Sequence, residues 1–228
     1  VWFFAGNAYA ITPRDTFGTT KNSQYVTAPT NLANGDRLNP VEFMPMTRLK
    51  NDQYFTPPEA VYPLLKTLSL GVDDLTFEPC AGDGNIAQCL RDDGHEELLW
   101  TGDIDYTLKG LSLPGFDATD RRQWENAFEQ FKPEWVITNP PYKQPDCDRI
   151  IQNAWAFAEK GVAMLLRLTY LEPCRERANF LKLAPLTHLI ILNPRPQFIP
   201  GKKATDACTV AWFVWQKGGN FHTKITYC

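Results

Sequence analysis

Short apolar runs and amphipathic segments alternate along most of this chain. In the segment 148–160, Ile150, Ile151, Ala154 and Trp155 recur at helical spacing. The apolar runs are too short for buried helices, so they predict strands that are buried on both faces. Such strands, alternating with helices, indicate an α/β protein with a largely parallel sheet and helices on both of its faces. The predicted strands are 75–78, 98–102, 135–138, 162–168, 188–192 and 209–215, and the amphipathic segments include 121–132 and 148–160.

The first part of the chain follows a different pattern. Residues 1–53 have no sustained hydrophobic period and are rich in Thr, Asn, Pro and Gly, which predicts an irregular N-terminal extension. The segment 57–69 then has the pattern of a helix that proline opens. A chain of 228 residues is long enough for one sizeable core, and we assign residues 54–228 to it.

Composition narrows the class of protein. A hydrophobic content of 43% with 21% charged residues is ordinary for a globular protein, and no apolar run approaches the ~20 residues of a membrane span. The net charge of −3 argues against a protein that coats nucleic acid non-specifically, although it is compatible with a local basic groove. None of the six cysteines forms a Cys-x-x-Cys pair and the three histidines are scattered. We therefore expect no metal site, and free thiols in a reducing cytoplasm.

A glycine-rich turn follows the predicted strand 75–78. It reads "EPCAGDG" at 78–84 and opens a predicted helix. Gly82 and Gly84 would let the backbone approach a ligand closely, and the start of the helix offers free N–H groups. The Gly-Lys-Ser/Thr of a phosphate-binding loop and the third glycine of a dinucleotide fingerprint are both absent. Taken alone, the turn is also compatible with an ordinary tight turn.

Carboxylates follow the next predicted strands. Asp103 and Asp105 come about 20 residues after the glycine turn, where a nucleoside-binding α/β protein needs an acceptor for ribose hydroxyls. Asp117 follows a short apolar stretch, and at the end of a third strand it would accept from an adenine amino group. Each of these residues could be a solvated turn aspartate. Their order and spacing favour a nucleoside site.

The predicted strand 135–138 ends abruptly in Asn139-Pro140-Pro141-Tyr142. Proline donates no backbone hydrogen bond and restricts the residue before it, so this loop is rigid. Asn139 offers a side-chain carbonyl, Pro140 a backbone carbonyl and Tyr142 a flat ring. Two acceptors beside a ring suit an exocyclic amino group on a planar base. By accepting both N–H hydrogens they would aim the nitrogen lone pair at an electrophile and stabilise the positive charge that develops on nitrogen.

With these motifs in this order, the chain resembles the S-adenosylmethionine-dependent amino-methyltransferases, specifically the DNA adenine N6 group of the gamma type. The resemblance covers about residues 54–215. "YFTPPEAV" resembles that family's methionine-binding motif, "EPCAGDGNI" its cofactor turn, "GDIDY" its ribose strand, "FD" its adenine contact and "NPPY" its catalytic loop. It implies a Rossmann-like methyltransferase sheet of seven strands, mostly parallel with one antiparallel strand and with helices on both faces. It also implies S-adenosyl-L-methionine as cofactor and DNA as substrate.

The resemblance assigns roles to individual residues. The target base, flipped out of the duplex, would stack between Tyr142 and Phe198, although Phe198 could equally be a core residue. Basic residues after the later strands would contact nucleic acid phosphates, although each by itself is more typical of a solvated position. The catalytic loop would be Asn139, Pro140, Pro141 and Tyr142. The cofactor would be held by Thr56, Glu78, Pro79, Cys80, Ala81, Gly82, Gly84, Asp103, Asp117 and Asn139. The nucleic-acid contacts would be Lys143, Arg195, Lys202 and Lys203, with Arg167, Arg175 and Arg177 also on the candidate phosphate track.

Gamma-type enzymes usually carry a separate target-recognition domain. Here the chain ends at Cys228, soon after the last predicted strand, so we expect 54–228 to be a methyltransferase catalytic domain without one. Sequence specificity would then be short or relaxed, or would come from loops or a partner protein. By the resemblance we expect this cytoplasmic enzyme in a bacterium or a phage-infected cell.

Other functions share part of the pattern. Protein-glutamine methyltransferases carry the same loop, and RNA methyltransferases that act on guanine amino groups carry close relatives of it. The glutamine enzymes usually have a cofactor turn richer in Gly and Ser, so "EPCAGDG" and "FTPPEAV" favour the DNA group. A non-catalytic module of the same fold is a further alternative, against which the intact loop and cofactor turn argue.

Overall fold

The computed structural model describes residues 56–172, 174–198, 208–219 and 222–228. The predicted extension 1–53 and the predicted phosphate contacts Lys202 and Lys203 lie outside these ranges. Within them, no helix is long and apolar enough to cross a membrane.

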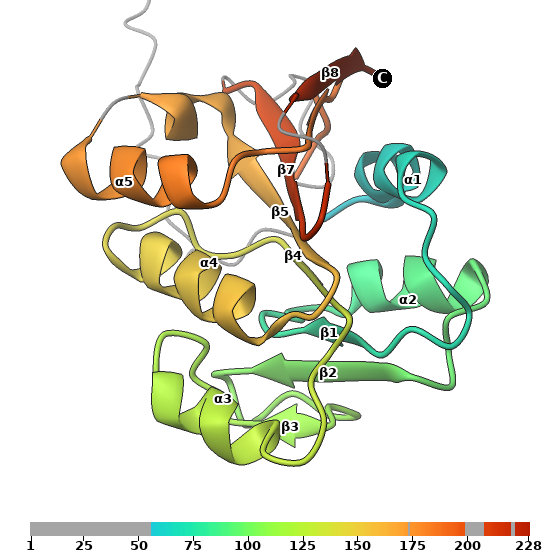
Figure 1. Ribbon diagram of the computed structural model, residues 1–228. Helices are drawn as coiled ribbons and strands as arrows, with labels where there is room; N and C mark the ends of the chain where they lie inside the picture. The colour runs from blue at the N-terminus through green and yellow to red at the C-terminus, as the bar shows by residue number, and fades with distance from the viewer. Residues whose placement is uncertain (1–55, 173, 199–207, 220–221) are drawn as a thin grey trace, which may run out of the picture. The chain divides into compact units, whose positions relative to one another are not determined.

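One sheet organises the described residues (Figure 1). Its strands run in the order β3-β2-β1-β4-β5-β7-β6-β8. Strand β7 is antiparallel to both of its neighbours, and every other pairing is parallel. The prediction of a mostly parallel sheet with one antiparallel strand is therefore confirmed. The strands are β1 (Thr76–Glu78), β2 (Leu99–Asp103), β3 (Leu113–Pro114), β4 (Trp135–Thr138), β5 (Gly161–Arg167), β6 (His188–Ile191), β7 (Val210–Gln216) and β8 (Lys224–Tyr227).

The prediction of seven strands is wrong by one, because the described residues form eight. The additional strand is β8, which pairs with β6 at the edge of the sheet. Only one of the four residues of β8 is even partly buried, and Ile225 and Tyr227 are 57% and 72% exposed. An edge strand that contributes no buried residue leaves no apolar run in the sequence.

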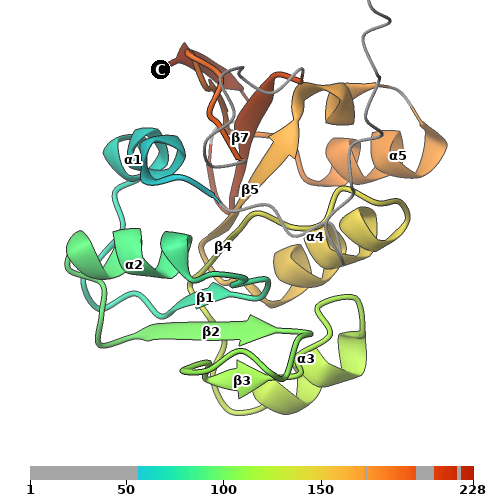
Figure 2. The same ribbon diagram turned by 180° about the vertical axis from the view of Figure 1, so that it is seen from behind.

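Helices cover both faces of the sheet, as predicted (Figures 1 and 2). Two helices, α1 and α2, lie on one face, and α3, α4 and α5 lie on the other. Helix α3 is shorter than the amphipathic segment 121–132 suggested, since it ends at Ala127. The helices are α1 (Pro58–Thr67), α2 (Asn85–Asp92), α3 (Arg121–Ala127), α4 (Asp146–Phe157) and α5 (Arg175–Leu183).

The core is divided by the sheet into two buried clusters. On the α1–α2 face, Leu64 and Leu90 pack with the sheet residue Trp212, whose indole N–H donates to the carbonyl of Ala60 at 2.6 Å. On the other face, Phe77 packs with Trp124 and other aromatic rings. Successive residues of β7 alternate between the two clusters, as the period of a strand requires. This double burial explains why the inner strands were visible as continuous apolar runs.

The strand order places the loops of interest along one edge. The chain moves from β1 outward to β2 and β3, then returns to pair β4 on the other side of β1. The loops that leave β1 and β4 therefore diverge from neighbouring parallel strands. In open α/β sheets, a crevice for ligands forms at such a change of direction, outside the carboxyl ends of the strands.

Candidate functional site

The glycine turn that leaves β1 needs glycine for its backbone conformation. Gly82 and Gly84 have φ of 52° and 80°, in the left-handed region that side chains disfavour. A Cβ atom at either position would meet no described atom within 4 Å, so neither glycine is required by packing. Pro79, Cys80 and Ala81 form the start of the turn, and the N–H of Ala81 donates to the carbonyl of Gly102 at 2.9 Å. The turn thus presents open backbone beside the end of β2.

Asp103 joins this turn to the turn after β2. Its Oδ2 accepts from the N–H of Gly82 at 2.9 Å, and its Oδ1 accepts from the N–H of Asp105 at 2.8 Å. The side chain is only 6% exposed, so both bonds are shielded from water. Each carboxylate oxygen can accept a further hydrogen bond, which leaves Asp103 able to receive a ligand hydroxyl as well.

Glu78, at the end of β1, is a buried acid with an orphaned oxygen. The residue is 1% exposed, and its Oε2 has no hydrogen-bond partner among the described residues. Burial raises the pKa of Glu78 well above its usual value, the charges of Asp83 and Asp103 add to this, and the Ala87 backbone N–H opposes it only in part. A buried polar atom of this kind usually has a partner. A donor on a ligand, such as an ammonium group, would supply one.

Asn139 follows β4 directly, and its side chain lies between two hydroxyl groups. Its Nδ2 donates to Thr56 Oγ1 at 3.0 Å, and its Oδ1 accepts from the Tyr142 hydroxyl at 3.0 Å. Thr56 precedes helix α1, 83 residues earlier in the chain. The fold therefore brings the "FTPP" segment and the "NPPY" loop into direct contact.

Arg167 is a neighbour of the loop that no motif singled out as a partner of Tyr142. It ends β5, is exposed, and places its guanidinium carbon 5.1 Å from the centre of the Tyr142 ring. This is the geometry of a cation–π contact. The strand register explains this contact. Strands β4 and β5 are parallel neighbours with Thr138 opposite Met164, and Tyr142 and Arg167 follow soon after these two residues at the same end of the sheet.

The other predicted residues occupy different surroundings. Asp117 follows β3, and its Oδ1 accepts from the backbone and the hydroxyl of Thr119 at 2.9 and 2.7 Å. Phe198 is buried in the core cluster on the α1–α2 face, whereas Tyr142 packs against the cluster on the opposite face. Lys143 and Arg195 are exposed. The role of Phe198 as a second stacking ring stays a prediction, and it would require this ring to leave its present packing.

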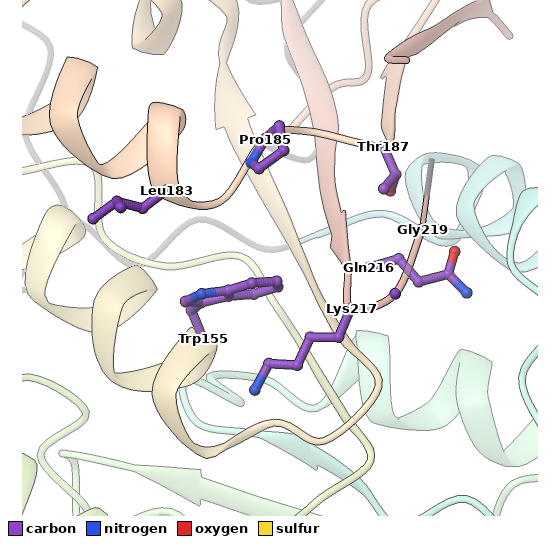
Figure 3. A pocket seen from close by; sticks show the side chains of 8 residues that line it. Trp155, Leu183, Pro185, Thr187, Gln216, Lys217 and Gly219 are labelled. Carbon is purple, nitrogen blue, oxygen red and sulfur yellow. The ribbon is translucent and has the colours of Figure 1, made fainter. Parts of the chain in front are cut away.

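A cavity of about 400 Å³ lies elsewhere (Figure 3). Trp155 and Lys217 flank it, and its lining includes Gln216, which ends β7 opposite the first residue of β5. It therefore opens at the amino end of β5, away from Asn139 and the glycine turn. Among the described residues, no group of three or more His, Cys, Asp or Glu side chains is placed to hold a metal ion.

No protein-family model matches the chain, and no curated protein sequence matches it. Solved structures do match. A type I restriction-modification methyltransferase subunit from Streptococcus thermophilus has a TM-score of 0.57 at 12% identity, over 76% of this chain and 47% of that one. A Listeria monocytogenes protein, assigned by inference to the class I S-adenosylmethionine-dependent methyltransferases, has a TM-score of 0.55 at 12% identity, over 76% of this chain and 65% of that one.

A third match is a Lactococcus lactis protein assigned by inference as a hemolysin, with a TM-score of 0.54 at 15% identity, over 77% of this chain and 94% of that one. The present chain spans about half the length of the restriction-modification subunit. At these identities the likenesses show that this chain shares its fold with these three proteins. The different names on one fold mean that the reaction must be argued from the site itself.

Proposed function

We propose that this protein transfers a methyl group from S-adenosyl-L-methionine to an exocyclic amino group, and that the substrate is N6 of adenine in DNA. The observation that carries the proposal is the position of the Asn139 amide. It follows β4 at the ligand-binding edge of a methyltransferase fold, and it is held between Thr56 and the ring that would receive the base.

The residues at this edge fit the cofactor. The glycine turn has open space where side chains would stand, Asp103 has acceptor capacity for ribose hydroxyls, and Glu78 has an orphaned buried oxygen for an ammonium group. Asp117, after β3, would accept from the adenine amino group. The cofactor supplies an electrophilic methyl group when it is bound.

The residues of the loop would prepare the acceptor nitrogen. Asn139 Oδ1 and the carbonyl of Pro140 would accept its two hydrogens and direct its lone pair away from the ring. The same two oxygens would stabilise the positive charge on nitrogen until one proton leaves to solvent. In the structure, the Tyr142 hydroxyl donates to Asn139 Oδ1, and this oxygen has a second lone pair that can accept from the substrate amine. Stacking on the Tyr142 ring would hold the base.

The choice of DNA rests on the motifs and on charge. "FTPPEAV" and "EPCAGDG" resemble the DNA adenine group more than the glutamine enzymes. Arg167, beside the Tyr142 ring, would place a cation where a phosphate flanking the base could approach.

We also propose that residues 54–228 form the catalytic domain. A partner protein would supply sequence recognition, since the matched restriction-modification protein is named as one subunit of a system.

The test is to incubate the protein with methyl-labelled cofactor and, in parallel, with duplex DNA, single-stranded DNA, RNA and protein. Mass spectrometry of the products then identifies the methylated group. We expect label on adenine N6 in DNA, and its loss in Asn139→Ala but not in Asn126→Ala, an exposed asparagine of α3. Label on glutamine or guanine would refute the substrate and keep the loop chemistry. Full transfer by Asn139→Ala would refute the mechanism.

A further inference from the structure

We propose that Thr56 is a positioning residue for the catalytic amide, and that its hydroxyl fixes which way round the Asn139 side chain faces. This role rests on the proposed function. It is distinct from the cofactor contact that the "FTPP" motif implies, because it concerns the donor group of Asn139.

The contact is short and sheltered. Asn139 Nδ2 donates to Thr56 Oγ1 at 3.0 Å, and Thr56 is 4% exposed. Water therefore competes poorly for this bond. The two partners come from separate parts of the chain, the end of β4 and the residues before α1, so the bond also connects the Asn139 loop to the start of α1.

Orientation matters because the two ends of an amide have opposite hydrogen-bonding character. With Nδ2 held by Thr56, Asn139 presents the acceptor Oδ1 on its other side, where the Tyr142 hydroxyl now donates. The reversed amide would present an NH2 group to an incoming amine. Two donors would then face each other, and the proposed chemistry would lose one of its two acceptors.

The contact with the Tyr142 hydroxyl does not by itself define the orientation, because a phenol can either donate or accept a hydrogen bond. The Thr56 hydroxyl has the same freedom until its single proton is used. Among the described residues, the Thr56 hydroxyl accepts from Asn139, and none of them accepts its proton. A ligand acceptor at the site would take the proton. Thr56 Oγ1 could then only accept from Asn139, and the amide would be locked in its productive orientation.

The variant that isolates this role is Thr56→Val, which keeps the shape and removes the hydroxyl, with Thr56→Ser as the conservative control. We expect Thr56→Val to lower kcat roughly five- to tenfold at saturating cofactor and DNA, the loss of one orienting hydrogen bond. Thr56→Ser should restore most of the rate. Combined with Asn139→Ala, Thr56→Val should cause no further loss, since the two residues act as a unit.

A residue that only holds the cofactor would behave differently. Thr56→Val would then raise the KM for cofactor and leave kcat unchanged, and this result would overturn the proposal. If Thr56→Val does not fold, as judged by its thermal transition, Thr56→Ala replaces it.

The side-chain NH2 resonance of Asn139, identified by its loss in Asn139→Ala, gives a readout that needs no turnover. We expect it to shift and to exchange faster with solvent in Thr56→Val. An unchanged resonance would overturn the proposal even if the wild type methylates DNA. A shifted resonance in a wild type that methylates no substrate would refute the proposed function, and with it the catalytic role of Thr56, while the hydrogen bond itself would stand.

Discussion

Asp103 offers a quantitative test of how the two ligand-facing turns are joined. Its carboxylate accepts the N–H of Gly82 with one oxygen and the N–H of Asp105 with the other. Asp103→Asn keeps the size of the side chain and replaces one acceptor by an NH2 group. One backbone N–H then faces a donor in a site that is 6% exposed. A hydrogen bond to a charged group contributes about 1.5–3 kcal/mol, so we expect the free energy of unfolding to fall by ~2 kcal/mol.

The assay is urea denaturation of the wild type and the variant, with the slope checked to be unchanged. The control is Asp120→Asn. Asp120 caps α3 and accepts one backbone N–H, from Arg122 at 3.0 Å. Asparagine caps helices about as well as aspartate, so the control should lie within ~0.5 kcal/mol of the wild type. Equal stability losses in the two variants would refute the idea that Asp103 joins the turns through both oxygens.

Three further predictions concern ligand binding. Tyr142→Phe removes the hydroxyl that donates to Asn139 Oδ1 and keeps the ring, so the KM for DNA should stay unchanged or fall. Tyr142→Ala removes the ring and should weaken base capture by ~1–3 kcal/mol. Equal KM values for the two variants would contradict this prediction. Arg167→Ala should weaken DNA binding and reduce its salt dependence by about one phosphate contact. The control Arg121→Ala removes an arginine of α3 that lies 5.4 Å from the centre of the Phe157 ring, and it should have neither effect. Because the raised pKa keeps Glu78 protonated above its usual range, an ammonium ligand should displace up to about one proton and bind more tightly as pH rises through that pKa. Calorimetry in buffers of different ionisation enthalpy should detect this proton, and Glu78→Gln should abolish it.

The parts of the fold that the sequence revealed are those buried on both sides. Strand β4 is buried at every position and β7 at all but its last, so each stood out as an apolar run. The elements that the sequence did not predict are exposed. Strand β8 lies at an edge, and α5 has no buried residue among those described, so neither carries a period that can be read.

The candidate site divides in a similar way. Local motifs indicated the glycine turn and the rigid loop, because prolines and glycines constrain the backbone where they stand. The hydrogen bond from Gly82 to Asp103 was consistent with parallel neighbouring strands. The contact between Thr56 and Asn139 spans 83 residues, and no local pattern encodes it. The role of Phe198 could not be read from residue type, since an aromatic residue after a strand is compatible with either a stacking ring or a core residue. In the structure Phe198 belongs to a buried core cluster.

The most direct test of the central claim is the nucleoside content of duplex DNA after incubation with the protein and S-adenosyl-L-methionine. The account predicts N6-methyladenine with the wild type and none with Asn139→Ala at equal folded concentration. DNA that stays unmethylated, under conditions where calorimetry shows that the cofactor binds, would contradict it.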